Sequence, residues 1–376
     1  MAAGGSLGRQ PVKIERIEAF PVSIPLNHTY KDANRIETHS RDVVVKISAS
    51  GGAVGWGAGS PRTFPTGETQ ASAIKVLEEI LLPLLGGKDP FELEAIHREM
   101  GAAIPFHFAP KSAIDCALYD LQGRVLDQPV YNLLGGKIRD EMPSFDILPL
   151  ETPEITAEIA SAARAEGTMA FKIKMNRDLK TSVARVRAVR EAVGGEAMLV
   201  VDANTTWTSK LAISACSMIE EYDITMVEQP VSGHDIDGME FITRNTRVRI
   251  CADESMRPDY MAELMRRRAA DVVNIKVNRE GGLLPCKKAA AMAEMHGIEG
   301  LCGSVIQGVL IDAAAAHLFA STPGIIYNES GKAPAWHDLD IATGLRVENG
   351  MVKVPEGPGL GVEIDEKVLR KFLSAD

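Results

Sequence analysis

The sequence is poor in cysteine, and the cysteines it has do not form pairs. They are odd in number and scattered, with no Cys-x-x-Cys spacing. The five are Cys116, Cys216, Cys251, Cys286 and Cys302. Because disulfide frameworks use even numbers of regularly spaced cysteines, this usage predicts reduced thiols in a reducing compartment.

Long apolar runs and a targeting pattern are also missing. No apolar run reaches the roughly 18 residues of a membrane span. The first residues, MAAGGSLGRQ, lack the charged-then-apolar order of a signal peptide. We therefore expect a cytoplasmic protein with no membrane partner.

The chain has no excess of positive charge. Its formal net charge is −10, and it carries no basic stripe that would neutralise phosphates. We therefore expect a small-molecule partner and no nucleic acid. What is present is an ordinary globular composition, 45% apolar and 24% charged, over 376 residues. That length allows a barrel-sized domain and a smaller one, because single cores stop growing near roughly 250–300 residues.

From about residue 145 the sequence repeats one form: a β-branched run that ends in a polar residue, then an amphipathic stretch rich in Lys, Glu and Ala. The eight runs are PSFDIL (143–148), AFKIKM (170–175), MLVVDAN (198–204), ITMVEQP (224–230), VRICADES (248–255), DVVNIKV (271–277), IEGLCGS (298–304) and GIIYNES (324–330). In the helix-like stretch after the first run, Pro153 suits the first turn and Gly167 the C-terminal cap. Eight alternating strand and helix units predict an α/β fold, a TIM-type (β/α) barrel with a parallel sheet.

The chain on either side of these units has different patterns. Residues 12–145 show antiparallel-strand patterns followed by helical ones, which predicts an α+β domain. The hairpin signal Asn349-Gly350 lies near the end of the chain, and we expect its strands to return to the N-terminal domain. The predicted division is an α+β capping domain at 1–140, a modified (β/α) barrel at 141–345 and a returning C-terminal segment at 346–376.

The polar residues that end the strands fall at barrel spacing. Lys174, Asp202, Glu228, Asp253 and Lys276 are separated by 28, 26, 25 and 23 residues, one β-α unit per interval. In a (β/α) barrel the C-terminal ends of the strands converge on one mouth, where active sites are built. These five charged side chains are therefore expected to meet in one place.

Three of these residues are carboxylates, with no His or Cys among them. Asp202, Glu228 and Asp253 offer hard oxygen ligands, which favour Mg²⁺ over zinc, with Mn²⁺ as a substitute. Each residue alone also suits the N-cap of a following helix. Three carboxylates in register, flanked by strands that carry lysines, favour the metal site.

The flanking lysines suggest proton transfer. A cation between two amines is the layout for removing a proton next to a carboxylate, with Lys174 and Lys276 facing each other to take or give the proton. Lys172 lies two residues before Lys174 on the same strand, so both side chains point the same way. We predict that its charge lowers the pKa of Lys174 toward the working pH.

The order K-x-K, D-A-N, V-E-Q-P, A-D-E-S and N-I-K resembles the enolase superfamily, in its muconate-lactonising subgroup. The helical segment 112–136 and the tail GPGLGVEID are similar to that family as well. The resemblance implies a capping domain over a modified barrel, a homo-oligomer, and Mg²⁺ on Asp202, Glu228 and Asp253. It also implies acid/base roles for Lys174 and Lys276, with Lys172 assisting Lys174, Asn204 behind the metal site and Glu254 near Lys276.

The family resemblance also bears on the seventh and eighth strands. The histidine base that mandelate racemase carries on the seventh strand is absent, since that position reads Cys302-Gly303-Ser304. This groups the chain with the two-lysine enzymes. Glu329, at the end of the eighth strand, resembles a glutamate of muconate cycloisomerases. The Asp-x-Asp of dipeptide epimerases is not at that strand end, and we interpret the later Asp338-Leu339-Asp340 as the start of a helix.

Several residues are candidates for contacts with substrate. SPRTFPTGET, which contains Thr63 and Phe64, resembles the substrate loop of some muconate cycloisomerases. His28 and Tyr30 are expected to close over the substrate from an early loop, although a solvent-exposed turn explains them equally well. The remaining substrate candidates are Ser304, Glu329 and Trp336, of which Glu329 suits a substrate cation and Trp336 a cation–π wall.

The shared half-reaction leaves the overall reaction open. We predict Mg²⁺-dependent abstraction of the α-proton of a carboxylate, by an isomerase of the muconate cycloisomerase or racemase/epimerase type. One alternative is a dehydratase acting on a hydroxy acid or a hydroxyproline-type substrate. The rival from another class is a non-catalytic carboxylate-binding protein, which would be expected to lack at least one ligand or lysine.

Overall fold

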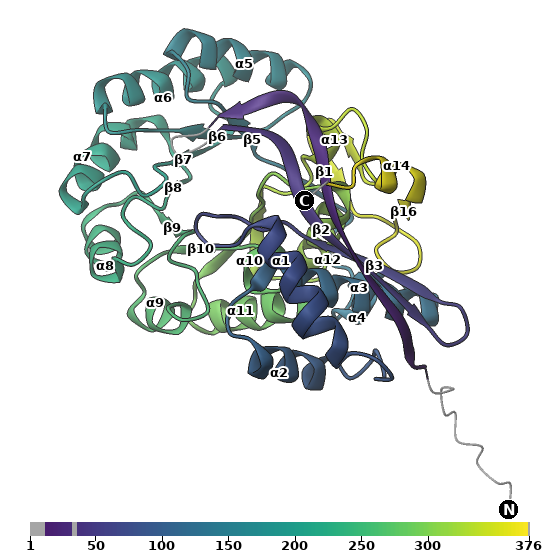
Figure 1. The fold of residues 1–376 in the computed structure, drawn as a ribbon. Helices are drawn as coiled ribbons and strands as arrows, with labels where there is room; N and C mark the ends of the chain where they lie inside the picture. The colour runs from purple at the N-terminus through teal and green to yellow at the C-terminus, as the bar shows by residue number, and fades with distance from the viewer. Residues whose placement is uncertain (1–11, 32–35, 375–376) are drawn as a thin grey trace, which may run out of the picture.

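A computed structural model describes residues 12–31 and 36–374, and Figure 1 shows its fold. The barrel sheet has eight parallel strands in the order of the chain, β5 to β12. They are β5 Asp146–Leu148, β6 Ala170–Lys174, β7 Met198–Asp202, β8 Met226–Glu228, β9 Ile250–Ala252, β10 Val272–Ile275, β11 Glu299–Cys302 and β12 Ile325–Asn328. Each lies within one of the eight predicted runs, which confirms the barrel. The backbone N–H of Phe145 donates to the carbonyl of Asn328 at 3.0 Å, linking the first and last strands.

Helices surround this sheet (Figure 1). The longer ones are α5 Pro153–Ala165, α6 Leu179–Val193, α7 Ser209–Ile219, α8 Ile236–Asn245, α9 Met261–Arg267, α11 Leu283–Met295 and α12 Val309–Ala320. Helix α5 begins and ends as predicted. The Thr152 hydroxyl accepts from the N–H of Ile155, Pro153 is the first helical residue, and Gly167 follows the helix with a φ of 100°.

Strand alternation builds two layers inside the barrel. The lower layer is an apolar floor formed by Phe145, Ala170, Val200, Met226, Cys251, Val272 and Leu301. A residue two positions further along a strand points to the same side, closer to the mouth. Lys172, Asp202 and Glu228 therefore stand directly above Ala170, Val200 and Met226. Polar side chains form the second layer because of this period of two.

The N-terminal domain combines a three-stranded antiparallel sheet with helices. Its elements are β1 Ile14–Lys31, β2 Ile36–Ala49, β3 Val54–Gly59, α1 Gln70–Val76, a π-helical turn Leu77–Leu81, a 3₁₀ turn Leu82–Leu84, α2 Leu93–Ala103, α3 Phe108–Leu126 and α4 Val130–Leu133. The β1–β2 hairpin extends to the barrel (Figure 1), where the side-chain amide of Asn27 donates to the carbonyl of Ala335 at 2.7 Å. The short helix α13 Ala333–Trp336 thereby joins the wall of the mouth.

Alternate glycines on β3 allow α3 to pack against the sheet. A Cβ on Gly57 would lie 2.2 Å from the carbonyl oxygen of Ala113, and one on Gly59 would lie 2.0 Å from that of Ala109. Both obstacles are backbone atoms, which a rotamer change does not relieve. We expect Gly57→Ala to lower the free energy of unfolding by about 3 kcal/mol, as overpacking of a core does. Denaturant unfolding measures this, and Gly86→Ala is the control, since a Cβ there meets no atom within 4 Å. Equal stability of the two variants would contradict the packing argument.

The C-terminal part departs from prediction in one respect. Asn349 and Gly350, with φ values of 52° and 72°, join β14 Arg346–Glu348 to β15 Met351–Lys353 as the hairpin signal indicates. The prediction that these strands return to the N-terminal domain is wrong, because β15 pairs with β4 Glu141–Pro143 beside the barrel.

Later residues of the C-terminal part reach the N-terminal sheet. The N–H of Ser23 donates to the carbonyl of Phe372 at 2.9 Å, after α14 Glu366–Lys371. The short strands β13 Ala342–Thr343 and β16 Glu363–Ile364 pair with each other. The division at residues 140 and 345 stays a prediction. No helix in the described ranges has the length and apolarity to cross a membrane.

Candidate active site

One cavity at the mouth of the barrel is lined by every predicted site residue except His28. The barrel contributes the charged residues at the C-terminal ends of its strands. Pairing in register sets Lys174 beside Asp202, and Asp202 beside Glu228, on neighbouring strands. The N-terminal domain contributes Tyr30, Thr63 and Phe64 to the same cavity. Residues up to about a hundred positions apart in the sequence therefore meet at the mouth, as their spacing predicts.

The two predicted acid/base lysines each contact a different predicted metal ligand. Lys174 Nζ donates to Asp202 Oδ2 at 2.7 Å and to Asn204 Oδ1 at 3.1 Å. Lys276 Nζ donates to Asp253 Oδ2 at 2.7 Å, from just beyond the end of β10. The ammonium groups thus flank the row of carboxylates, with Glu228 on the strand between Asp202 and Asp253. This arrangement offers a proton donor or acceptor on either side of a molecule bound over the row.

Lys172 lies deeper than Lys174 and contacts carboxylates on two sides of the barrel. Its Nζ is 2.8 Å from Glu228 Oε2 and 2.8 Å from Glu329 Oε2, and its side chain is buried. Burial opposes the charge of Lys172, but Glu228 and Glu329 raise its pKa well above the ordinary value.

The prediction that the pKa of Lys174 is lowered is wrong for the protein without a bound cation. Burial and Lys172 both act in the predicted direction, but the contact with Asp202 outweighs them and the pKa is raised. Lys172 is visible in the sequence as a neighbour of Lys174, whereas the carboxylate of Asp202 comes into contact with Lys174 only in the folded protein. A cation bound to Asp202 would compete with Lys174 for that oxygen and shift this balance.

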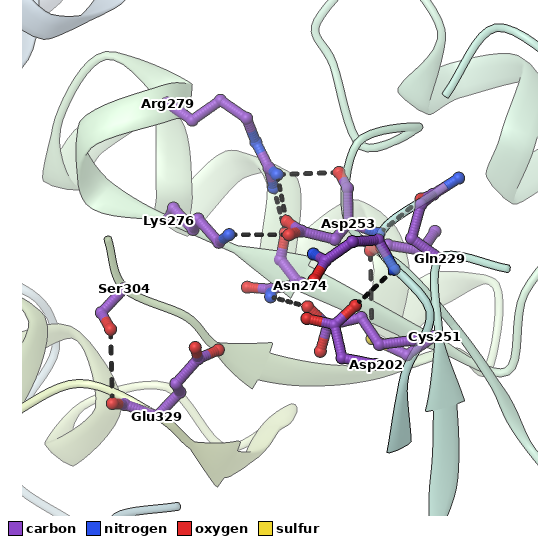
Figure 2. A network of polar contacts seen from close by, with 12 residues as sticks. Asp202, Gln229, Cys251, Asp253, Asn274, Lys276, Arg279, Ser304 and Glu329 are labelled. Atoms are coloured by element: carbon purple, nitrogen blue, oxygen red, sulfur yellow. Dashed lines mark hydrogen bonds and ion pairs between the residues drawn. The ribbon is translucent and has the colours of Figure 1, made fainter. Parts of the chain in front are cut away.

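Three polar residues that support the site were not predicted. Arg279 donates to the Asp253 carbonyl at 2.7 Å and also to its Oδ1, so that Arg279 and Lys276 converge on Asp253 (Figure 2). Gln229 Oε1 accepts from the backbone N–H groups of Asp253 and Ser255, at 2.8 and 3.0 Å. Asn274 Nδ2 donates to Glu228 Oε1 at 3.2 Å.

The sequence positions of two of these three residues could have indicated that they lie near the site. Gln229 follows Glu228 in V-E-Q-P, and Asn274 is two residues before Lys276, on the same side of the strand. Arg279 lies on the short helix α10 Val277–Glu280, where no strand period applies.

The donor set fits a divalent cation. The network has six buried carboxylates and four cationic groups: Asp202, Glu228, Asp253, Glu254, Glu280 and Glu329 against Lys172, Lys174, Lys276 and Arg279. Burial, together with neighbouring carboxylates, raises the pKa of Glu228 and of Glu254 to about 8. Glu228 Oε2 lies near Lys172 but makes no hydrogen bond with it. Carboxylate oxygens are the ligands that Mg²⁺ and Mn²⁺ prefer. This site has more buried carboxylates than cationic groups, and one of their oxygens has no hydrogen-bond partner.

The carboxylates do not converge on one point by themselves. Within the described ranges, no three His, Cys, Asp or Glu side chains gather closely enough to hold a metal ion. The ammonium groups and Arg279 occupy the carboxylate oxygens instead, as on Asp202 and Asp253. Asp253 illustrates the effect: burial opposes its ionisation, yet Lys276 and Arg279 hold its pKa well below the usual range.

The residues predicted to bind substrate occupy different parts of the mouth. The rings of Tyr30 and Trp336 lie 6.4 Å apart and form one wall. Ser304 donates to the carbonyl of Glu329 at 3.4 Å (Figure 2). His28 does not line this cavity; it lines a neighbouring cleft and is exposed. It lies where the pairing of β1 with β2 is irregular, between Pro25 and Tyr30.

The interpretation of Asp338-Leu339-Asp340 as a helix start is wrong. Helix α13 ends at Trp336, and these three residues are irregular. Asp340 Oδ2 instead accepts from the N–H of Val309 at 3.1 Å, at the N-terminus of α12. The pattern therefore has a capping role for a different helix.

Comparison with known families agrees with this geometry. Residues 18–135 match the mandelate racemase / muconate lactonizing enzyme N-terminal domain, and residues 154–368 match the enolase C-terminal domain-like family. The chain belongs to the mandelate racemase/muconate lactonizing enzyme family. This confirms the resemblance to the enolase superfamily that the strand-end motifs indicated.

Relatives within the mandelate racemase/muconate lactonizing enzyme family have several isomerase activities. The N-succinyl-L-Arg/Lys racemase of Bacillus cereus is 33% identical, over 96% of this chain and 98% of its own length, and its crystal structure superposes with a TM-score of 0.93. A dipeptide epimerase of Enterococcus faecalis, solved with Mg and the dipeptide L-Leu-L-Tyr, is 33% identical over 93% of this chain and 99% of its own, with a TM-score of 0.90. Muconate cycloisomerase 1-1 of Acinetobacter lwoffii is 31% identical over 96% of each chain. The chain is therefore an enzyme of a family whose similar members are isomerases.

Proposed function

We propose that this enzyme inverts the α-carbon of a carboxylate by Mg²⁺-dependent removal and return of its proton, and that it acts on an N-acylated amino acid or dipeptide. The observation that carries the proposal is the position of Lys174 and Lys276 on either side of one buried row of carboxylates. Inversion requires a base on one face of the carbon and an acid on the other, and two lysines supply both.

Each residue has a role in this scheme. Asp202, Glu228 and Asp253 would hold Mg²⁺, whose charge stabilises the enolate oxygens that develop as the α-proton leaves. The lysine facing the proton receives it at Nζ, and the lysine on the opposite face donates a proton from its own Nζ. Lys172 stays charged between Glu228 and Glu329 and holds both side chains in position. Gln229 and Arg279 fix the backbone and carboxylate of Asp253.

The choice of racemisation or epimerisation rests on the two lysines and on the relatives. N-succinyl-L-Arg/Lys racemase and the dipeptide epimerase are among the relatives of highest identity, and both names describe inversion next to an acylated nitrogen or peptide. A second candidate is cycloisomerisation of a muconate. It is favoured by Glu329, which directly follows β12 and lines the cavity as the similar glutamate of muconate cycloisomerases would. The dehydratase has no specific feature of the cavity in its favour.

The direct test is exchange of the α-proton in D₂O with Mg²⁺. A panel of N-acylamino acids, dipeptides, proline derivatives, hydroxy acids and muconates is offered, and the products are examined by NMR and chiral separation. We expect deuterium at the α-carbon of both enantiomers of an N-acylamino acid or dipeptide. A lactone from a muconate, or an unsaturated acid from a hydroxy acid, without inversion of any substrate would overturn the proposal in favour of the corresponding reaction.

Removal of the metal has a predicted effect on stability as well as on activity. Because Mg²⁺ binds the folded site and not the unfolded chain, a concentration of 100 times Kd adds about 2.7 kcal/mol to the free energy of unfolding. We expect thermal unfolding in Mg²⁺ to occur several degrees higher than in EDTA. The shift should be lost in Asp202→Asn and kept in Asp237→Asn, an exposed aspartate on α8. An equal shift in both variants would contradict the assigned ligands. No shift in the wild type would contradict them as well and would favour a non-catalytic carboxylate-binding protein.

A further inference from the structure

The second layer inside the barrel has one position without a side chain. Each strand, or the residue just beyond it, contributes one member of this layer, two positions after its member of the apolar floor. The eight members are Ile147, Lys172, Asp202, Glu228, Asp253, Asn274, Gly303 and Glu329. Gly303 therefore leaves a space among charged side chains, beside Asn274 on the neighbouring strand.

The amide of Asn274 occupies this space. A Cβ built on Gly303 would lie 1.9 Å from Asn274 Oδ1, and the three atoms nearest to it all belong to the Asn274 side chain. The backbone of Gly303 has no positive φ that would itself require a glycine. Gly303 is thus needed for the room that it leaves to the neighbouring amide.

This amide bonds one of the two oxygens of Glu228. Asn274 Nδ2 donates to Oε1 at 3.2 Å, and Lys172 Nζ donates to the same oxygen at 3.0 Å. Oε2 lies 2.8 Å from Lys172 Nζ but makes no hydrogen bond. Because two donors hold Oε1, the carboxylate is turned so that Oε2 stays open.

The other two proposed cation ligands have no oxygen left open in this way. Both carboxylate oxygens of Asp202 accept a hydrogen bond, and so do both of Asp253. Among the described residues, Glu228 Oε2 is therefore the one oxygen of the three ligands that accepts no hydrogen bond. A cation that enters the site meets this oxygen without displacing a hydrogen bond from it.

We propose that Asn274 is a positioning residue for Glu228: its amide, given room by Gly303, turns the carboxylate so that Oε2 faces the divalent cation. Asn274 does not line the active-site cavity, so it acts through Glu228 and not on the substrate. This inference rests on the proposed function for the identity of the cation ligands.

The test measures cation binding, so that it does not depend on turnover. Calorimetric titration of Mg²⁺ into the substrate-free enzyme gives a Kd for each variant. Asn274→Ala should weaken binding roughly 10- to 100-fold, as loss of a group that orients a metal ligand does. Asn274→Leu, which retains the volume of the side chain without its donor, should weaken binding to a similar degree. A wild-type Kd in Asn274→Leu would overturn the proposal, because only the cavity would then matter.

Gly303→Ala tests the same amide from the neighbouring strand. Its methyl group would meet the far end of a flexible side chain and no backbone atom nearby, so we expect the fold to be kept and the amide to be displaced. Binding should weaken as in Asn274→Ala. In the double variant the amide is already absent, so adding Gly303→Ala to Asn274→Ala should change Kd by less than about twofold. Effects that multiply, or a wild-type Kd in Gly303→Ala, would overturn the proposal.

Val273→Ala is the matched control for damage to the strand. Val273 precedes Asn274 on β10, is buried and packs outside the barrel sheet. Its truncation should lower the temperature of thermal unfolding and leave the Mg²⁺ Kd unchanged. If Val273→Ala weakened binding as much as Asn274→Ala, the effect would belong to the stability of the strand and the proposal would be wrong.

Failure of the proposed function has a different signature. Mg²⁺ binding that depends on Asn274 and Gly303, without inversion of any compound on the substrate panel, would sustain this inference and refute the proposed reaction. Inversion by an enzyme whose Mg²⁺ Kd is the same with and without the Asn274 amide would sustain the reaction and refute the positioning role.

Discussion

Lys174→Ala should abolish inversion, with kcat at least about 10³-fold below the wild type, as expected for loss of an acid/base group. One enantiomer should still exchange its α-proton for deuterium. Lys276 remains on the opposite face, and it can remove and return a proton there without inverting the carbon. Lys276→Ala should behave as the mirror image and exchange only the other enantiomer. NMR of each enantiomer in D₂O, followed by chiral analysis, measures both effects.

The controls for this pair address folding and charge. Lys174→Ala leaves Asp202 without its 2.7 Å partner, so Lys174→Arg, which retains the charge, is examined beside it. Circular dichroism and thermal unfolding in Mg²⁺ verify that each variant is folded. If Lys276→Ala keeps full inversion activity, the two-base scheme is wrong. If either variant exchanges both enantiomers at the wild-type rate, that lysine transfers no proton.

Arg279→Met should lower the free energy of unfolding by about 3–5 kcal/mol, the range for removing one partner of a buried ion network. Arg279 bonds Asp253 and Glu280 and is itself buried, so its loss leaves two buried carboxylates with fewer partners. Asp253 keeps Lys276 but loses the guanidinium that fixes its backbone carbonyl. Denaturant unfolding measures the change.

Arg187→Met is the matched control. Arg187 pairs with Glu191 one turn along α6 at 3.8 Å, with both side chains more than half exposed, and such pairs contribute little. Adding Glu280→Gln to Arg279→Met should recover part of the lost stability, because it removes one of the two carboxylates left behind. An Arg279→Met protein as stable as the control would show that the network does not need the guanidinium.

Much of the fold followed from the sequence because buried parallel strands and their period leave a strong pattern. The regular interval between Lys174, Asp202, Glu228, Asp253 and Lys276 located both the strands and the mouth, and the family match confirms the barrel. No sequence pattern indicated the pairing of β15 with β4, because the residues of a short hairpin specify its turn but not the strand that pairs with the hairpin. The sequence therefore predicted the hairpin at Asn349-Gly350 and misplaced its partner.

The site was predictable where strand alternation decides direction, and less so elsewhere. Asp202 and Glu228 had to face the mouth with Lys172, because each lies two residues above the apolar floor. Arg279 and His28 depend on the path of a short helix and a long hairpin, which no periodicity describes. The pKa of Lys174 depends on which neighbour is closest, and the contact with Asp202 is a tertiary distance that strand spacing does not give. The acid/base and ligand roles themselves stay predictions.

The apolar floor of the barrel has a consequence for isotope experiments. The polar layer lies above buried apolar side chains, among them Phe145, Met226 and Leu301. Hydrogens on the lysine ammonium groups therefore exchange with bulk water through the mouth. A bound substrate obstructs that same opening. On the proposed roles, a proton taken by Lys174 or Lys276 would then be held until the molecule above it departs. The rate at which the starting enantiomer takes up deuterium, compared with the rate of its inversion, would thus report how long the molecule stays in the cavity relative to the time that a lysine needs to exchange its proton.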